Sequence, residues 1–150
     1  MPRSYCSLMY HIVFSTKQRE PWLSDEIRPR IHEYLGGIIR KDGGTALIVN
    51  GTSDHVHLLA NLHQDRSVSH IVRTMKSNST GWIHRTFRDL AQFAWQAGYG
   101  AFTVSRSQVE RTRTYIMRQA EHHKKLSFKE EFVALLNAHK IEYDEPYLWD

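Results

Sequence analysis

Apolar residues along the chain recur at spacings that predict short strands separated by amphipathic helices. Leu8 to Ser15 is a run of apolar and β-branched residues, which predicts a strand. A helix is expected to follow Pro21, beginning at Ser24 or Asp25, either of which can cap it, and ending near Lys41. The residues expected on its apolar face are Ile27, Ile31, Leu35 and Ile38. The turn-forming sequence Asp42-Gly43-Gly44 ends this helix.

Two more strands are predicted, from Thr45 to Gly51 and from His55 to Leu62. Only three polar residues separate them, so they are expected to pair as a hairpin. A second helix is expected from Ser67 to about Phe87, because its apolar residues follow helical spacing. The breaker sequence Ala97-Gly98-Tyr99-Gly100 precedes a fourth predicted strand, Ala101 to Ser105.

The C-terminal third is predicted to be helical. Ser107-x-x-Glu110 and Ser127-x-x-Glu130 both match the capping box, in which two side chains satisfy the free N–H groups of a helix start. They predict one continuous helix to about Lys125 and a last helix to about His139. The tail after Ile141 is expected to be irregular.

The predicted order of elements is strand, helix, strand, strand, helix, strand, followed by helices. This order is typical of an α+β, ferredoxin-like βαββαβ fold, an antiparallel sheet with helices on one face, here with C-terminal helices added. The chain has 150 residues and no linker or repeat, which predicts a single domain over residues 1–150. Many nucleic-acid-binding domains share this fold, so the fold alone does not determine function.

Basic residues are concentrated in two of the predicted helical segments. The net charge is only +4, but Lys and Arg cluster between residues 66 and 88 and between residues 106 and 125. Clustered cations suit a polyanion such as DNA, because phosphate contacts supply most nonspecific affinity. Two solvated helix faces would show the same pattern, so charge alone favours neither interpretation. The candidates for DNA contact are Arg73, Lys76, Arg111, Arg113 and Arg118.

Composition excludes several other classes of protein. The apolar runs are too short to span a bilayer, and the N-terminus lacks the apolar stretch of a secretory signal. Cys6 is the only cysteine, so neither an internal disulfide nor a cysteine zinc cluster can form. We therefore expect no membrane association and a cytoplasmic location.

The sequence His55-Val56-His57 is the first candidate for chemistry. On a strand, residues i and i+2 point to the same face, so the two imidazoles can hold one divalent cation while Val56 points into the core. The chain has ten histidines, so a His-x-His pair also arises by chance and is weak alone. A structural or incidental pair is the alternative.

Tyr115 and Gln119 strengthen the case for a metal site. On a helix, i and i+4 lie on one face, which places a phenol beside a carboxamide. The phenol is a candidate nucleophile, and the amide oxygen is a hard ligand suited to Mg²⁺ or Mn²⁺. The alternative is that Tyr115 is an amphipathic core residue and Gln119 an ordinary surface residue. His122 and His123 follow as secondary candidates.

Taken together, five segments resemble the small single-tyrosine HUH transposases of bacterial and archaeal insertion sequences, in which HUH denotes His, a hydrophobic residue and His. The segments are Tyr10–Lys17, Asp54–Leu59, Gly98–Ser105, Tyr115–His123 and Ile141–Glu145. They occur in the family's order and cover nearly the whole chain. Each segment is weak alone, but their combination is specific.

The resemblance implies a role for each matching residue. His55 and His57 match the metal-binding histidines, and Gln119 matches the third ligand of a Mg²⁺ or Mn²⁺ ion. Tyr115 matches the nucleophile that forms a covalent 5′-phosphotyrosine link to DNA. The family excises and inserts an element as single-stranded DNA, recognising hairpins near its ends. It is typically a homodimer with composite sites, in which the tyrosine helix of one subunit can complete the site of the other.

Two other classes of function compete with a DNA-strand transferase. One is a noncatalytic or domesticated module that binds single-stranded nucleic acid, with Tyr10, Phe14 and Phe102 exposed on the sheet to stack bases. The other is a hydrolytic metalloenzyme, which usually adds carboxylate ligands; Asp54 is the only acid close to the histidine pair in sequence.

The last two predicted helices carry apolar residues that a small sheet would leave partly uncovered. These are Phe128, Phe132, Leu135 and Leu136. We expect this surface to pack across the twofold axis of the dimer.

Overall fold

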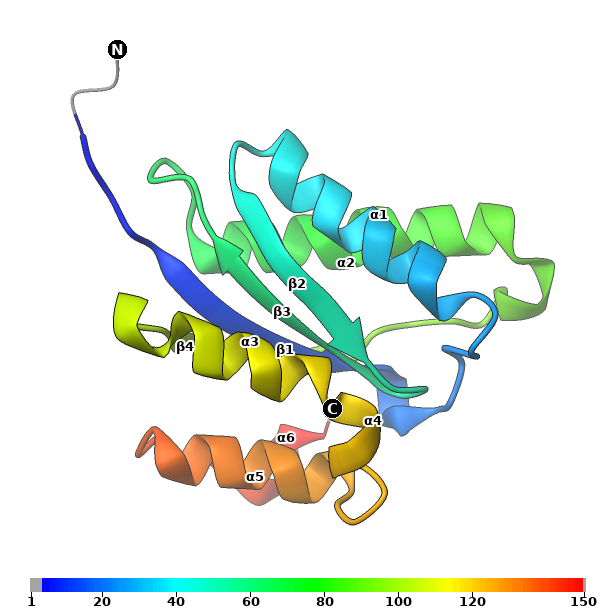
Figure 1. Ribbon diagram of the computed structural model, residues 1–150. Coiled ribbons are helices and arrows are strands. Elements are labelled where there is room, and N and C mark those ends of the chain that lie inside the picture. Colours follow the sequence, from blue (N-terminus) through cyan, green and yellow to red (C-terminus); the bar gives the residue numbers. More distant parts are fainter. Residues whose placement is uncertain (1–3, 150) are drawn as a thin grey trace.

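Strands β1 (Met9–Ser15) and β3 (His55–Asn61) form the middle of a four-stranded antiparallel sheet, and β2 (Thr45–Gly51) and β4 (Gly100–Thr103) form its edges. The computed structural model describes residues 4–149. The strand order is β2-β3-β1-β4, as expected for the ferredoxin-like fold (Figure 1). The predicted hairpin is confirmed, because β2 pairs with β3 along its length.

Helices cover both faces of this sheet (Figure 1). On one face lie α1 (Arg28–Lys41) and α2 (Val68–Thr86). On the other lie α3 (Val109–Met117), α4 (Gln119–His122) and α5 (Phe128–Ala138), with the short α6 (Glu145–Leu148) near the C-terminus. Short 3-10 helices span Lys17–Arg19, Arg88–Leu90 and Arg106–Gln108. The two helices of the βαββαβ unit, α1 and α2, thus lie on one face, and the added C-terminal helices lie on the other. This confirms the predicted fold class.

The alternation of side chains along the central strands separates two environments. Val56 and Leu58 of β3 join Ile12 and Phe14 of β1 in the main core under α1 and α2. Successive residues of a strand point to opposite faces, so His55 and His57 face the C-terminal helices instead. The alternation of β3 therefore determines which layer surrounds the histidines.

The first two helices begin and end close to the predicted residues. Regular α1 starts at Arg28 rather than Ser24, with a proline in its first turn, and it buries Ile39 rather than Ile38. It stops before Gly43, whose φ of +89° suits glycine. Ser67 caps α2 by accepting a hydrogen bond from the backbone N–H of His70 at 3.1 Å.

The prediction of one continuous helix from Ser107 to Lys125 is wrong. The helix ends at Met117 and restarts at Gln119, because the side chain of Asn50 donates hydrogen bonds to the carbonyls of Ile116 at 2.9 Å and Met117 at 3.2 Å. These bonds satisfy carbonyl groups that a helix end leaves free. A residue on a distant strand therefore ends the helix.

One predicted capping box forms and the other does not. Ser127 and Glu130 exchange both bonds of the box at the start of α5. No side chain caps α3, and the hydroxyl of Ser107 lies 3.2 Å from that of Ser105 instead. The tail, predicted to be irregular, contains the one-turn helix α6.

The apolar residues of α5 are buried within the chain. Phe128, Phe132 and Leu136 pack with Val13 of β1 and Phe102 of β4, and each is at most 5% exposed. The expectation that these three residues are left uncovered is therefore wrong, whereas Leu135 is only partly buried. Phe14 and Phe102 are also buried, and Tyr10 is partly buried. The sheet therefore does not expose these three aromatic rings for stacking on nucleic-acid bases.

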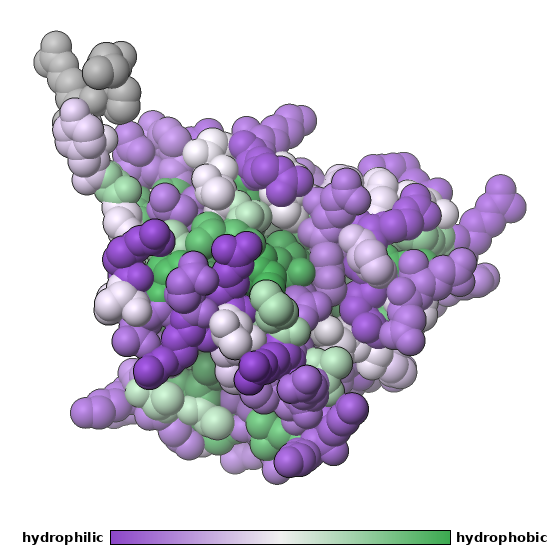
Figure 2. All heavy atoms as spheres, viewed as in Figure 1, coloured by the Kyte–Doolittle hydropathy of each residue, from purple (hydrophilic) through white to green (hydrophobic). Residues whose placement is uncertain are grey.

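Most of the surface on the side of α3 and α5 is hydrophilic (Figure 2). Apolar surface lies over β2, between α1 and α3, and in smaller patches beside α5 (Figure 2). Among the described residues, no helix is both long and apolar enough to cross a membrane.

Candidate active site

His55 and His57 lie side by side on β3, and neither is exposed to solvent. Their ring centroids are 5.1 Å apart, as expected for residues i and i+2 of a strand. Their Nε2 atoms both face one carboxylate oxygen, Glu131 Oε1, at 3.4 Å from His55 and 3.0 Å from His57. The two imidazoles therefore converge on one point.

The opposite nitrogen of each ring is held by a neighbouring side chain. His55 Nδ1 donates to Asp54 Oδ1 at 2.8 Å, and His57 Nδ1 lies 2.7 Å from Nε2 of the buried His11. Such contacts orient histidine rings in metal sites and leave the other nitrogen free for the metal. The sequence analysis did not single out His11. It lies two residues before Val13 on β1, so it points to the same face of the sheet, and Val13 pairs with His57.

Tyr115 and Gln119 reach the histidines despite the break at Arg118. Gln119 is buried, and its Oε1 accepts a hydrogen bond from His55 Nε2 at 2.9 Å. The ring centroid of Tyr115 lies 6.0 Å from that of His57. The structure therefore brings together the four residues predicted for the catalytic and metal-binding roles, all from one chain.

Glu131 of α5 occupies the centre of this cluster and was not predicted. Its side chain is 1% exposed. Oε2 accepts hydrogen bonds from the hydroxyl of Tyr115 and, at 3.0 Å, from Gln119 Nε2. Oε1 is 3.0 Å from Nε2 of His123 as well as of His57. The sequence does hold a sign of it, because Glu131 is a carboxylate that lies between Phe128 and Phe132, on the apolar face of α5.

Of the two secondary candidates, His123 is the one that reaches this centre. The preceding His122 instead stacks on the ring of Tyr115, with centroids 4.7 Å apart.

The hydrogen bonds set the protonation states of the site. Burial alone would lower the pKa of His55, but its bonds to Asp54, Glu131 and Gln119 raise that pKa to about 9. Burial lowers the pKa of His57 to about 4, so this ring is neutral. Burial opposes ionisation of Glu131, but the surrounding histidines hold its pKa far below the usual range. The cluster thus pairs an anionic carboxylate with a cationic imidazole.

Tyr115 stays neutral in this arrangement. Burial, and then the adjacent Glu131 carboxylate, raise the pKa of the phenol well above its ordinary value.

The donor atoms in the cluster fit a divalent cation. One ligand atom from each of His55, His57 and Glu131 lies within 4.8 Å of the others. Gln119 adds an amide oxygen at His55. Two imidazoles with carboxylate or amide oxygens suit a first-row divalent ion or Mg²⁺.

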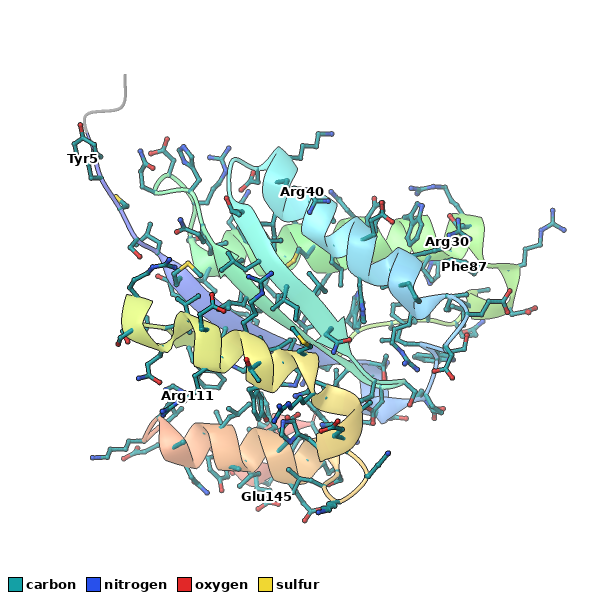
Figure 3. The ribbon with its side chains drawn as sticks, viewed as in Figure 1. Tyr5, Arg30, Arg40, Phe87, Arg111 and Glu145 are labelled. Atoms are coloured by element: carbon teal, nitrogen blue, oxygen red, sulfur yellow. The ribbon has the colours of Figure 1, made fainter. Side chains whose placement is uncertain are left out.

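The predicted DNA-contact residues lie in different places. Arg111, Arg113 and Arg118 are exposed on α3 and at its end, and Arg111 lies on the side of α3 that faces α5 (Figure 3). Arg73 is exposed on α2, in the layer across the sheet. Lys76 is partly buried, and its ammonium donates to the carbonyls of Gln96 at 2.8 Å and Gly98 at 2.5 Å.

The contacts of Lys76 give it a structural role. Burial lowers the pKa of its ammonium to about 8. Its bonds tie α2 to the loop that precedes β4.

Comparison with known proteins places this chain in a family. Residues 4–119 match the sequence profile of the family described as Transposase IS200 like. The ISDra2 transposase TnpA of Deinococcus radiodurans is 25% identical over 119 residues, covering 76% of this chain and 82% of the relative. The transposase for insertion sequence element IS200 of Salmonella typhimurium is 28% identical over 120 residues, covering 77% and 78%.

Two solved structures share the fold. A transposase from Deinococcus radiodurans superposes with a TM-score of 0.66 at 25% identity, covering 79% of this chain and 95% of that one. A REP-associated tyrosine transposase bound to a REP hairpin has the same fold, with a TM-score of 0.61 at 15% identity over 82% and 73% of the two chains. The profile match covers most of the chain and includes His55, His57, Tyr115 and Gln119. This chain belongs to the IS200-like family of transposases.

Proposed function

We propose that this transposase cuts and rejoins single-stranded DNA through Tyr115, with a Mg²⁺ or Mn²⁺ ion held beside it. The observation that carries the proposal is the position of the Tyr115 hydroxyl. It donates to the same carboxylate, Glu131, on which the Nε2 atoms of His55 and His57 converge. A nucleophile and a set of metal ligands thus share one centre.

The metal ligands in this proposal are His55, His57 and Gln119, with Glu131 as an additional oxygen donor. A divalent cation bound there would neutralise charge on the nonbridging oxygens of a phosphodiester. Asp54 and His11 orient the two histidines from behind. The chain's own side chains thus hold the ligand atoms in place.

Tyr115 would act by in-line attack on phosphorus. A bond forms between its phenolic oxygen and phosphorus, and the bond from phosphorus to the 3′ oxygen breaks, leaving a 5′-phosphotyrosine and a free 3′-hydroxyl. One phosphate ester replaces another, so the 3′-hydroxyl of a second strand can reverse the reaction without ATP. Excision and insertion of an element follow from two such exchanges.

The proposed substrate is single-stranded DNA that folds into hairpins at the ends of the element. Support comes from the structural relative that is bound to a REP hairpin. Arg111 and Arg113 on α3, and Arg118 at its end, flank Tyr115 and are the main candidates for phosphate contacts. Arg73 lies on the opposite layer, and Lys76 would have to release backbone carbonyls to bind DNA.

The test uses end-labelled single-stranded DNA from the flanks of the gene, incubated with Mn²⁺ and separated on a denaturing gel. We expect a protein-linked band that is lost in Tyr115→Phe, while DNA binding on a native gel is retained. Tyr147→Phe is the matched control, because Tyr147 is 72% exposed and remote from the histidines in sequence. Binding without any covalent band would support the noncatalytic module instead.

The metal assignment has its own test. His57→Ala is expected to abolish Mn²⁺ binding measured by calorimetry, together with metal-dependent cleavage. Undiminished Mn²⁺ binding in this variant would contradict the assignment.

We further propose a homodimer that forms through the apolar surface over β2 and not through α5. Leu47 and Ile48 are partly buried there, and Met117 at the end of α3 is 60% exposed. Light scattering should show a dimer that Met117→Lys converts to a monomer. A wild-type monomer at micromolar concentration would contradict this proposal.

Composite sites can be tested by mixing two inactive variants, Tyr115→Phe and His57→Ala. If the tyrosine helix is exchanged between subunits, mixed dimers regain one intact site and form adduct. If each site is completed within one chain, the mixture stays inactive. The hydrogen bond from Tyr115 to Glu131 within this chain corresponds to that second case.

A further inference from the structure

Helix α5 supplies a buried acid to a site whose histidine pair, Tyr115 and Gln119 all lie within the region that matches the family profile. The family profile ends at Gln119, twelve residues before Glu131 in the chain. We propose that Glu131 is the catalytic residue that accepts the proton of Tyr115 as the phenol attacks phosphorus. This inference rests on the proposed function, which names no residue that takes the phenolic proton.

The two oxygens of Glu131 have separate partners. Oε1 faces the imidazoles of His57 and His123, each at 3.0 Å. Oε2 accepts from the Tyr115 hydroxyl and from Gln119 Nε2. Oε1 can therefore stay at the histidines while Oε2 receives the phenolic proton.

The other titratable groups near the phenol are placed differently. His122 stacks on the Tyr115 ring at an interplanar angle of 29°, so it covers the ring face. His57 directs Nε2 to the carboxylate, and its Nδ1 contacts His11. Among the described residues, Glu131 is the one that accepts the hydrogen bond of the Tyr115 hydroxyl.

A proton acceptor is required because the phenol is neutral. The Tyr115 hydroxyl donates its proton in a hydrogen bond to Glu131 Oε2, so the acceptor is in place before the phenol attacks. The phenolic oxygen becomes strongly acidic as its bond to phosphorus forms, so even a weakly basic carboxylate can take the proton at that stage. The electron pair of the broken P–O bond leaves with the 3′ oxygen, which takes a proton from water to become the free 3′-hydroxyl. In rejoining, the attacking 3′-hydroxyl gives its proton to water, and Glu131 returns its proton to the departing phenolate.

The fold holds Glu131 in place from both sides. The capping box at Ser127 fixes the start of α5 one turn before Glu131. Phe128 and Phe132 anchor the same helix against Val13 and Phe102. The side chain is thus preorganised at the hydroxyl, as a general base requires.

The experiment compares Glu131→Gln with Glu142→Gln, which makes the same charge change at an exposed residue of the tail. The rate of adduct formation is measured in a single turnover with flanking single-stranded DNA, at Mn²⁺ concentrations that calorimetry shows to be saturating for each variant. We expect a fall of about 100- to 1,000-fold for Glu131→Gln, unchanged DNA affinity, and a normal rate for Glu142→Gln. A normal rate in Glu131→Gln would overturn the inference.

A second measurement separates proton transfer from a structural role. Tyr115 is replaced by a ring-fluorinated tyrosine, whose phenol is more acidic and needs less help to ionise. The loss of rate caused by Glu131→Gln should then be at least about tenfold smaller, because a more acidic phenol depends less on a base to take its proton. A defect of unchanged size would overturn the inference.

Folding of the variants is checked by thermal unfolding. If Glu131→Gln does not fold, Glu131→Asp, which keeps a carboxylate but draws it back from the hydroxyl by one methylene, takes its place. A slower rate that the fluorinated tyrosine does not relieve would then overturn the inference. Failure of the proposed function looks different, because wild-type protein would then form no adduct or Tyr115→Phe would still form one.

Discussion

The rings of His11 and His57 are joined by a 2.7 Å hydrogen bond between Nε2 of His11 and Nδ1 of His57. Both side chains are buried, and burial lowers their pKa values to about 3 and about 4, so the pair is neutral. A neutral imidazole nitrogen either donates or accepts, according to its tautomer. His11 can therefore satisfy Nδ1 of His57 whether Nε2 of His57 carries a proton or binds a metal.

Replacing His11 should weaken the metal site without breaking the fold. His11→Phe keeps a ring in the core but leaves His57 Nδ1 without its partner. Loss of such an outer contact typically lowers metal affinity 10- to 100-fold, which is the fall expected for Mn²⁺ in calorimetry. The exposed His70 provides the control His70→Phe, which should bind Mn²⁺ normally. Equal affinity in both variants would show that His11 does not orient His57.

The salt dependence of DNA binding should identify the face that contacts the strand. Arg111 lies on the side of α3 that faces α5 (Figure 3). Arg73 lies on α2, in the layer across the sheet. Arg111→Ala should reduce the slope of log affinity against log salt by about 0.7, the value for one phosphate contact with single-stranded DNA. Arg73→Ala should change it less. The reverse result, from titrations at several salt concentrations, would place the strand on α1 and α2.

The capping box at the start of α5 should make a measurable contribution to the free energy of unfolding. Ser127→Ala removes the side chain that accepts from the Glu130 N–H, and caps of this kind contribute about 1 kcal/mol. The control is Ser107→Ala, which matches the same sequence motif but caps no helix. Urea unfolding should therefore separate the two variants, with a loss only at Ser127. Equal losses would contradict the assignment of the cap.

His32 should make the fold less stable in acid. Burial, and then nearby Arg28 and His55, lower its pKa from 6.5 to about 4. The unfolded chain therefore binds a proton before the folded protein does, so stability is full above pH 6.5 and falls as the pH drops toward 4. His32→Gln, which does not titrate, should lessen this fall by about 2 kcal/mol, after allowance for solvent screening.

The measurement for His32 is urea unfolding at a series of pH values between neutral and acidic. The exposed His70→Gln variant is the control and should follow the wild type. A parallel pH dependence in His32→Gln and the wild type would show that His32 is not the group responsible.

Local pattern was enough to predict the order of strands and helices and the hairpin. It also determined that His55 and His57 share a face, because the two-residue period of a strand is set by its backbone. The spacing of Tyr115 and Gln119 indicated a common side even though the helix between them is broken at Arg118. These features depend on neighbours in sequence and were therefore visible in it.

Only the tertiary structure decided what faces the two histidines. His11 comes from another strand, and Glu131 and His123 come from beyond the tyrosine helix. Periodicity states which side of its own element a residue occupies, but not which distant element packs against that side. The break after Met117 has the same origin, since the carbonyls that end the helix are bound by Asn50 on an edge strand. The sequence thus determined the parts of the site, and long-range packing determined the acid at its centre.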